Sequence, residues 1–502
     1  MSGGWLSPRG RVLSRAGIGV LGWVIAPDLV DEAVGDGLAW EMRLRALPAR
    51  LGVYFVLGLC LFSAMPYGQV LQQLVSGLEA ALAAAGWRVP ASTALTGVRR
   101  RAGVKPLESL FWRLCGAVSP GRAPWSHVCG LLAVAWDGTT VTVAASGENI
   151  AAFGRPRRKD GGDCHYPQVR LVSLVACGTR ALLGAAMGPV TGKGTGERAL
   201  AAGLLGRLRP GMLLIADRNF YSWQLWHAAA ATGADLLWRV KSSTLLQPAR
   251  VLPDGSYLAV IPDPAANARR IRRNGERRRR GSTLPPDTAP VPGITVRVIE
   301  FWVRAAGEDG RTRTELYRVI TTLTDWRRCP ASELAAGYGW RWAIETGYRE
   351  FKTYLRGPGR ILRSRTPDLA RQEIWAYLAI YQAIRVIICH AAARGRLDPD
   401  QISFTAALHA VRRTLTAASD GMAGALATTQ ASILTQLVPP RPGRVWVRAV
   451  TAPRGPYPSR GNTKGPISQH ATYTLTITPP GATRQTTTDQ PGQPEHQANQ
   501  PP

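Results

Sequence analysis

The sequence predicts a mixed α/β fold: a sheet flanked by helices, with a helical region before it and a β-rich insertion within it. Two observations lead to this prediction. Apolar residues recur at helical spacing in the first 118 residues, and short apolar strands begin at Leu131. Three strands are followed by a helix, a strand, a helix and another strand, which is typical of a mixed sheet. The chain has 502 residues, 45% of them hydrophobic, which allows about three domains and excludes a wholly disordered protein.

Residues 1–118 are predicted to be a helical domain, and a role in DNA binding is one of two interpretations of its basic segment. Apolar positions repeat every three or four residues in 70–82 and in 107–114. A short helix at 94–102 ends in three arginines, Arg99, Arg100 and Arg101. They suit the second helix of a helix-turn-helix that contacts DNA. They equally suit a solvated helix end, because cations there complement the helix dipole.

Residues 126–244 are predicted to hold the first part of the sheet. Short apolar runs bounded by Gly, Pro and polar residues are typical of strands. The expected strands lie at 131–136, 169–176, 181–188, 212–216 and 234–240, with helices at 196–207 and 222–232.

Residues 245–330 are predicted to be a β-rich insertion with a basic loop. Alternating polar and apolar residues predict strands at 294–304 and 314–324. The run 269–280 holds eight Arg and one Glu. It suits contact with phosphates, and a solvated or disordered loop is the alternative.

Residues 331–437 are predicted to be helical again. Residues 438–502 are rich in Pro, Gly, Thr and Gln and hold few large apolar side chains, which predicts a disordered tail.

The net charge of +29 is the strongest feature of the composition. There are 62 Lys and Arg against 33 Asp and Glu, which indicates a polyanionic partner, with nucleic acid first and an anionic membrane surface second. The longest apolar run, residues 51–64, is too short to span a bilayer and suits a buried helix. The seven cysteines have no C-x2-C spacing, which argues against a disulfide framework or a zinc ribbon and favours a reduced, cytoplasmic protein.

Two aspartates end apolar strands, where open α/β sheets place their ligands. Asp137 ends the strand at 131–136, and Asp217 ends the strand at 212–216. Two carboxylates on neighbouring strands repel each other unless a cation joins them, and a divalent metal ion does this best. Arg218 can also neutralise one of them. Asp-Gly and Asp-Arg-Asn are good turn formers, so a turn role is the alternative.

A polar stripe is predicted on the helix at 338–352. At about 100° per residue, four of its side chains fall within an arc of ~60°. They are Tyr338, Arg341, Glu345 and Lys352. Such a face suits a site, and it equally suits a surface ladder of ion pairs.

These four residues match the signature Y-x2-R-x3-E-x6-K, and the chain resembles transposases of the insertion-sequence-4 group over roughly residues 40–440. WDGT around Asp137 and ADRNFYS around Asp217 resemble the first and second acidic motifs of that group. Asp217 follows Asp137 by 80 residues and precedes Glu345 by 128. The longer interval resembles the β-rich insertion in the group's RNase-H-like catalytic fold, so the resemblance implies an RNase-H-like sheet here.

The resemblance implies a DDE transposase that binds terminal inverted repeats, cuts the element's ends and joins them to target DNA. Asp137, Asp217 and Glu345 would be the catalytic residues and would hold two Mg²⁺ ions, with Mn²⁺ as a substitute. Tyr338, Arg341 and Lys352 would contact phosphates beside the scissile bond. Arg239 and Lys241 are further candidate DNA contacts, or ordinary charges at a strand end.

The implied partners are double-stranded DNA, from element ends and target, and a second copy of the chain in a synaptic homodimer. A membrane partner is not expected, and the implied location is the bacterial cytoplasm, at the nucleoid. Two alternatives stay open. One is a catalytically inactive, transposase-derived DNA-binding protein. The other is a general RNase-H-like nuclease, which gives no reason for the helical first domain or the basic insertion.

Overall fold

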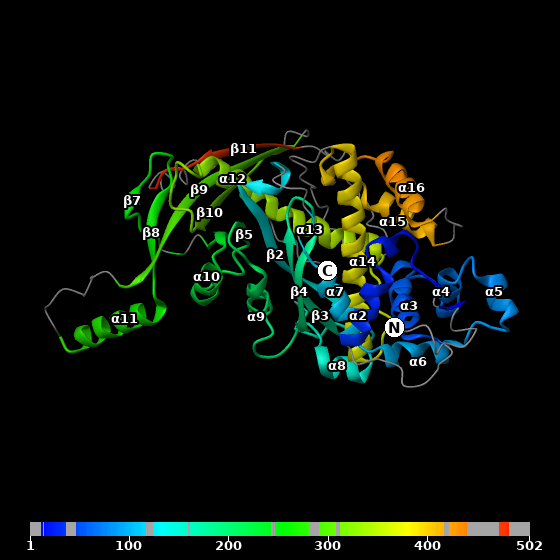
Figure 1. Cartoon of the computed structure of the whole chain (residues 1–502). Coiled ribbons are helices and arrows are strands. Elements are labelled where there is room, and N and C mark those ends of the chain that lie inside the picture. Colours follow the sequence, from blue (N-terminus) through cyan, green and yellow to red (C-terminus); the bar gives the residue numbers. More distant parts are fainter. Residues whose placement is uncertain are drawn as a thin grey trace, which may run out of the picture. The chain divides into compact units, whose positions relative to one another are not determined.

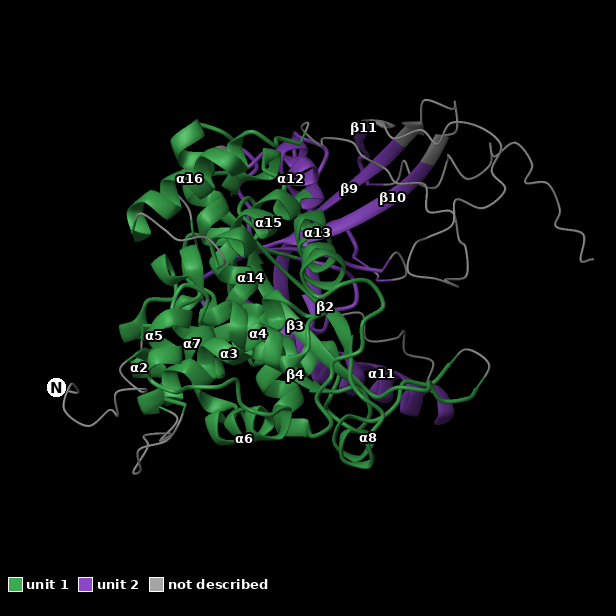
Figure 2. Ribbon diagram, turned by 90° about the vertical axis from the view of Figure 1, so that its right-hand side faces the viewer, with its two compact units in different colours: residues 1–215, 340–442, 448–465 green, residues 216–339, 443–447, 466–502 purple. Residues whose placement is uncertain are grey.

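The computed structural model describes residues 12–13, 15–36, 47–116, 118, 124–158, 161–241, 244, 246–281, 291–307, 312–415, 421–438 and 471–480. The chain forms two compact units, coloured in Figure 2. Unit 1 comprises Met1–Ile215, Trp340–Pro442 and Arg448–Gly465. Unit 2 comprises Ala216–Gly339, Gly443–Val447 and Pro466–Pro502. These bounds differ from the predicted domain division, which stays a prediction.

The first part of unit 1 is helical, as predicted (Figure 1). Every residue of α3 from Leu51 to Leu61 is buried, which accounts for the long apolar run. Leu107, Leu110 and Phe111 form the buried stripe of α7, at the spacing of an amphipathic helix. The elements are η1 Gly19–Trp23, α2 Pro27–Asp36, α3 Ala49–Leu61, α4 Tyr67–Leu74, α5 Glu79–Ala84, α6 Ser92–Ala102 and α7 Lys105–Leu114.

The last helices of unit 1 are α14 Pro367–Gly395, α15 Phe404–Thr414 and α16 Met422–Leu434. Thr366 caps α14 by accepting the Leu369 N–H, and Pro367 occupies its first turn. By length and composition α14 resembles a membrane span, yet 89% of its most apolar window is buried inside the protein. Phe111 of α7 packs on Trp375 of α14 with ring centroids 5.1 Å apart. α14 is therefore the core helix of the helical layer.

The sheet of unit 1 has the strand order β4-β3-β2-β5, with β1 paired to β2. β2, β3 and β4 are antiparallel neighbours, and β5 runs parallel to β2. This mixed order confirms the predicted fold class, a sheet of RNase-H-like topology flanked by helices. The elements are β1 His127–Val128, β2 Leu131–Thr142, α8 Gly147–Phe153, β3 Gln168–Ala176, β4 Leu182–Pro189, α9 Glu197–Ala202, η3 Leu205–Arg207 and β5 Met212–Ala216.

Unit 2 holds a second set of strands in the order β6-β10-β9-β8-β7, and β11 also pairs with β9. The long strand β9 pairs with β10 on one edge. On its other edge it pairs first with β8 and then with β11. The elements are α10 Trp223–Ala230, β6 Asp235–Arg239, β7 Arg250–Val251, β8 Tyr257–Pro262, α11 Pro264–Arg279, β9 Gly293–Gly307, β10 Thr312–Thr321, α12 Ala331–Tyr338 and β11 Ala471–Ile477.

The arginine run is helical, which corrects the prediction of a basic loop. It lies on α11, a helix of 16 residues with no buried residue. Asp263 caps this helix by accepting the N–H groups of Ala265 (2.7 Å) and Ala266 (3.2 Å), and Pro264 occupies the first position. Arg277, Arg278 and Arg279 lie in the last turn, where cations complement the helix dipole. These local signals favour a helix in spite of the dense arginines that led to the prediction of a loop.

The C-terminal segment contains a strand, which corrects the prediction of a wholly disordered tail. Residues 471–477 form β11, antiparallel to β9, with Ile477 opposite Phe301. The sequence ATYTLTI alternates Thr with larger residues, a strand pattern that the surrounding low-complexity composition obscures. The other residues predicted to be disordered are outside the described part, except 438 and 478–480.

Two cysteines depart from the expectation of a fully reduced chain. Cys129 and Cys329 each take part in a disulfide. Short-range spacing rules miss them, because neither belongs to a C-x2-C pattern. The free cysteines among the described residues are Cys60, Cys115, Cys164, Cys177 and Cys389.

Candidate active site

Asp137 lies within β2, not at the end of a strand as predicted. β2 continues beyond it because β2 and β3 stay paired, with Asp137 opposite Ser173. The parallel pairing with β5 ends earlier, at Ala135 opposite Ile215. Asp137 therefore lies where its neighbouring strand has ended, and its carboxylate has no strand beside it on that edge.

Asp217 follows the last residue of β5. It is the second residue after Ile215, just as Asp137 is the second after Ala135. Its Oδ1 accepts the N–H of Arg218 at 2.7 Å. The Phe220 N–H donates to the Asp217 carbonyl at 3.0 Å, which is the turn geometry expected as the alternative role.

The signature segment is not one regular helix, which corrects the predicted stripe. It comprises α12 up to Tyr338, a 3₁₀ turn Gly339–Arg341, α13 Trp342–Arg349 and a π-helix Glu350–Leu355. Gly337 and Gly339 flank Tyr338, and glycine is a poor helix former. Tyr338 belongs to unit 2, whereas the three other signature residues belong to unit 1. A π-helix within a helical segment is frequent at functional sites.

Within unit 1 the structure brings three signature residues close to Asp137. Arg341 Nη1 lies 3.1 Å from Glu345 Oε1, and both side chains act on the charge of Asp137. Lys352 Nζ donates to Thr139 Oγ1 at 3.0 Å, two residues along β2. Arg341 is buried and Glu345 is partly exposed. Two carboxylates, a guanidinium and an ammonium thus lie around one stretch of β2.

The environment of Asp137 favours its neutral form. Burial raises its pKa to about 6, and the carboxylates of Glu345 and Glu197 add to this effect. The Gly138 N–H, which donates to Oδ1 at 2.8 Å, and the charge of Arg341 lower the pKa in part. The charge of Arg341 offsets the effects of burial and of the neighbouring carboxylates only in part, and a divalent cation would supply the remaining positive charge.

The donors around Asp137 fit a hard cation, because they are carboxylate oxygens, which Mg²⁺ prefers over nitrogen or sulfur. Among the described residues, no three Asp, Glu, His or Cys side chains are grouped closely enough to hold a metal ion. The fit therefore rests on the chemistry of the donors and on the raised pKa of Asp137.

Sequence reasoning missed Glu197 and Tyr348. Glu197 opens α9, and its carboxylate lies against Gly138, so a Cβ at position 138 would collide with it. The Tyr348 hydroxyl donates to the Asp137 carbonyl at 2.6 Å and accepts the Ser173 N–H at 3.1 Å. Tyr348 thus ties α13 to β2 and β3 beside the candidate catalytic aspartate. Its position one turn after Glu345 is the only sequence signal for it.

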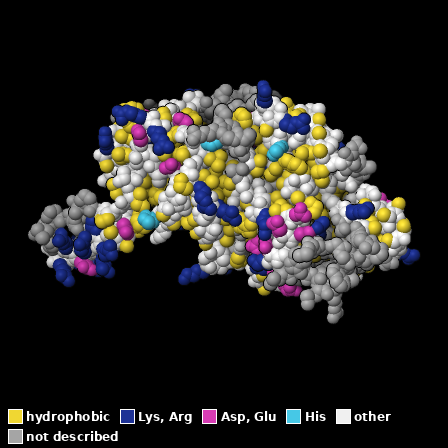
Figure 3. All heavy atoms as spheres, in the orientation of Figure 1, with side chains coloured by type: hydrophobic (Ala, Val, Ile, Leu, Met, Phe, Trp, Pro, Cys, Tyr) yellow, Lys and Arg dark blue, Asp and Glu magenta, His cyan; other side chains and the backbone are white. Residues whose placement is uncertain are grey.

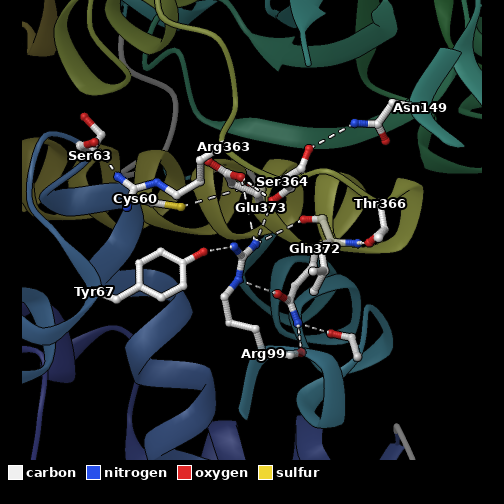
Figure 4. Close-up of polar contacts among 12 residues, drawn as sticks. Cys60, Ser63, Tyr67, Arg99, Asn149, Arg363, Ser364, Thr366, Gln372 and Glu373 are labelled. Carbon is white, nitrogen blue, oxygen red and sulfur yellow. Dashed lines mark hydrogen bonds and ion pairs between the residues drawn. The ribbon is translucent and has the colours of Figure 1, made fainter. Parts of the chain in front are cut away.

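The burial of Arg99 contradicts the prediction that it contacts DNA. Its side chain is 1% exposed and donates to Gln372 Oε1 (3.2 Å), Tyr67 Oη (2.6 Å) and Ser364 Oγ (2.8 Å), as Figure 4 shows. It also pairs with Glu373 at 3.8 Å. Arg99 therefore links α6 to α14 and has no surface left for DNA. Arg100 and Arg101 are exposed, and their DNA contact stays a prediction.

Three predicted DNA contacts lie in unit 2. Arg239 Nη2 donates to Glu315 Oε1 at 2.6 Å, and its guanidinium stacks 4.0 Å from the Tyr317 ring centroid. Tyr338 is buried, with its ring 5.9 Å from that of Tyr317. These contacts gather Arg239 and Tyr338 around Tyr317. Lys241, two residues beyond the end of β6, is exposed.

Comparison with known proteins identifies the family of the chain. The family described as "Insertion element 4 transposase N-terminal" matches residues 15–112. The family described as "Transposase DDE domain" matches residues 129–382, just over half of the chain. The chain is 27% identical over 448 residues to the transposase InsG for insertion sequence element IS4 of Escherichia coli (strain K12), covering 88% of this chain and 93% of that protein.

Among solved structures, a chain of the piggyBac transposase synaptic complex with hairpin DNA is similar over 85% of this chain and 86% of its own, with a TM-score of 0.40 and 10% identity. The two family matches cover the helical first part and the Asp137, Asp217 and Glu345 motifs in the predicted order. The chain belongs to the DDE transposases of the insertion-sequence-4 family, enzymes that cut DNA and transfer its strands.

Proposed function

We propose that the chain binds the terminal inverted repeats of its own element, cuts the DNA at those ends and joins them to target DNA. The environment of Asp137 supports this most strongly. A carboxyl that is buried beside Glu345 and Glu197, with its pKa raised to about 6, is poised to take a divalent cation at neutral pH.

Asp137, Asp217 and Glu345 are the proposed ligands of two Mg²⁺ ions, with Mn²⁺ as a substitute. The ions would activate the attacking water or 3′-hydroxyl and stabilise the leaving 3′-oxygen. The effect of Glu345 on the pKa of Asp137 within unit 1 supports the first and third ligands, and the match to the transposase DDE domain over residues 129–382, which include Asp217, supports the second. Tyr348 orients it by holding the main chain at Asp137.

The proposed DNA contacts form two groups, one beside the scissile bond and one further along the DNA. Arg341 and Lys352 would bind phosphates beside the scissile bond, because both lie around β2 near Asp137. Tyr338, Arg239 and Lys241 would extend that contact, and Arg100 and Arg101 would bind the duplex further away. Two copies of the chain would hold two element ends in a synaptic homodimer, in the bacterial cytoplasm at the nucleoid.

The test is cleavage of a DNA fragment that carries the sequences flanking the gene, with Mg²⁺ or with EDTA. Asp137→Asn, Asp217→Asn and Glu345→Gln should abolish cleavage and strand transfer while keeping DNA binding. Asp368→Asn is the matched control, because Asp368 is an exposed carboxylate, 81% accessible, at the start of α14.

Three results would contradict the proposal. Parental cleavage rates in all three variants would overturn the ligand set. Specific binding of the ends without metal-dependent cleavage would indicate a transposase-derived DNA-binding protein. Cleavage of RNA·DNA hybrids or arbitrary duplexes, with no need for terminal repeats, would indicate a general nuclease.

A further inference from the structure

Unit 1 contains a cavity of about 390 Å³ that lies away from Asp137. Its wall consists of the α3–α4 turn at 63–66, the segment 356–363 after the π-helix, and Glu373 and Tyr377 of α14. Arg360 and Ile361 are exposed, whereas Arg356, Glu373 and Tyr377 are buried. The cavity is therefore open at one side and polar at its base.

Arg356 is a buried cation with unsatisfied donors. Its side chain is 5% exposed, and its Nε and Nη1 atoms have no hydrogen-bond partner among the described residues. Burial lowers its pKa, and the nearby Tyr377 and Glu373 offset this only in part. A buried guanidinium whose N–H groups lack acceptors costs folding free energy. A ligand in the cavity that accepts these hydrogen bonds would remove this cost.

The other charges of the cavity leave an excess of positive charge. Arg360 Nη1 donates to the Ser63 carbonyl at 2.7 Å, and Arg363 donates to the carbonyls of Ser63 and Met65. Carbonyl groups order these guanidinium groups without neutralising them. Glu373 is the carboxylate of the wall, and it is already engaged, accepting from Ser364 Oγ at 2.5 Å and pairing with Arg99 (Figure 4).

We propose that this cavity, the Arg356 cavity, binds a phosphate group, and that the phosphate belongs to a strand of bound DNA. Guanidinium groups match the oxygens of a phosphate bidentately, and three of them line the cavity. A cavity of this size accommodates a phosphodiester with its bound water.

Continuity of positive charge with the candidate active site supports DNA as the source. Burial lowers the pKa of Lys352, and the charge of nearby Arg356 lowers it further. Lys352 in turn donates to Thr139, two residues from Asp137. A strand leaving the active site would therefore pass from Lys352 to Arg356. This assignment rests on the proposed DNA cleavage, whereas the binding of phosphate itself does not.

The first arm of the test uses the full-length protein without DNA. Inorganic phosphate is added at constant ionic strength while the midpoint of thermal unfolding is measured. The midpoint of the parental protein should rise with phosphate and level off, because the ligand binds only the folded state. Arg356→Gln should begin at the same or a higher midpoint and show no rise, and Arg356→Lys should recover part of it. Arg394→Gln, at the other end of α14 and exposed, should respond like the parent.

The second arm measures binding of a short DNA duplex as salt is raised. The plot of log affinity against log salt should be shallower by about 1 in Arg356→Gln and unchanged in Arg394→Gln. A phosphate response without any change in this slope would overturn DNA as the source and assign the cavity to a free phosphate. Identical behaviour of Arg356→Gln and the parent in both arms would refute the proposal that the Arg356 cavity binds phosphate.

The two proposals fail separately. If the parent cuts DNA with Mg²⁺ and Arg356→Gln is indistinguishable from it, the cavity proposal is wrong and the transposase function stands. If the parent takes up phosphate through Arg356 but neither binds nor cuts DNA, the function proposal and the DNA source are wrong and the phosphate site stands.

Discussion

At the scale of single residues, the negative charge that Asp137 needs to bind a metal ion lowers the stability of the folded protein. The folded protein raises the pKa of this carboxyl to about 6, whereas an unfolded aspartate titrates near 3.9. Well below pH 4 both states are protonated and the residue has no effect. Between pH 4 and 6 the unfolded aspartate ionises while the folded one keeps its proton, so stability falls across this window and levels off above pH 6, where the folded state carries a buried charge.

Asp137→Asn should therefore stabilise the metal-free protein at pH 7.5. The gain should approach about 2–3 kcal/mol, the equivalent of a pKa rise of about two units. It should shrink below pH 6 and vanish near pH 4. Thermal unfolding across this pH range, in EDTA, measures it. Mg²⁺ should stabilise the parent at pH 7.5 and not the variant. A difference that is the same at every pH would contradict the assigned pKa.

Tyr348 offers a second prediction at this scale, because it touches the main chain of Asp137 and not its carboxylate. Tyr348→Phe removes the hydrogen bonds to the Asp137 carbonyl and the Ser173 N–H. We expect a loss of about 1 kcal/mol of stability. Cleavage should fall by about 10- to 100-fold, because small displacements of a catalytic group are costly.

The measurement for Tyr348→Phe is the Mg²⁺ dependence of cleavage. A positioning role predicts that more Mg²⁺ is needed for half-maximal rate, which a loss of stability alone would not cause. Tyr354→Phe is the matched control, because Tyr354 is 43% exposed on the same helical segment. Equal Mg²⁺ curves for the parent and Tyr348→Phe would show that the hydroxyl serves only packing.

At the scale of elements, an arginine on one helix stabilises the contact with another. Arg99 of α6 is buried against Gln372 and Glu373 of α14 (Figure 4). Arg99→Ala leaves Glu373 buried with one partner fewer, and losing one member of a buried pair costs about 3–5 kcal/mol. Arg100→Ala, one residue away and exposed, should change stability by less than about 0.5 kcal/mol.

Denaturant unfolding and DNA binding separate these two arginines. Arg99→Ala should lower the midpoint of unfolding, and Arg100→Ala should instead lower the affinity for duplex DNA. An Arg99→Ala protein of parental stability would refute the structural role of Arg99 and restore its predicted contact with DNA.

The same elements show what the sequence can and cannot predict. The strand at 212–216 was predicted at its observed bounds, because an apolar run flanked by turn residues is a local signal. The helix at 338–352 was predicted as continuous, and the structure interrupts it at Gly339 and again at Glu350. The burial of Arg99 could not be predicted, because Gln372 and Ser364 lie about 270 residues further along the chain. Tyr348 was missed for the same reason.

At the scale of the whole molecule, the net charge of +29 has no single role. Arg99 is buried in the core and Arg341 pairs with Glu345, whereas the arginines of α11 face solvent. Figure 3 shows Lys and Arg side chains gathered over α11. An exposed helix that carries a dense set of arginines contributes affinity for any duplex, and that contribution weakens as salt rises.

Replacing Arg277, Arg278 and Arg279 by Gln tests this role. The triple variant should bind non-specific duplex more weakly, and its salt dependence should be shallower by up to about 3, since each phosphate contact adds roughly 0.9 to the slope. Helical circular dichroism should persist, because Asp263 still caps α11 and Gln is a good helix former. Glu276→Gln, which removes the opposite charge from the same turn, should not weaken binding. An unchanged salt slope in the triple variant would mean that the last turn of α11 does not contact the duplex. Other exposed arginines and lysines would then supply the affinity of the protein for DNA.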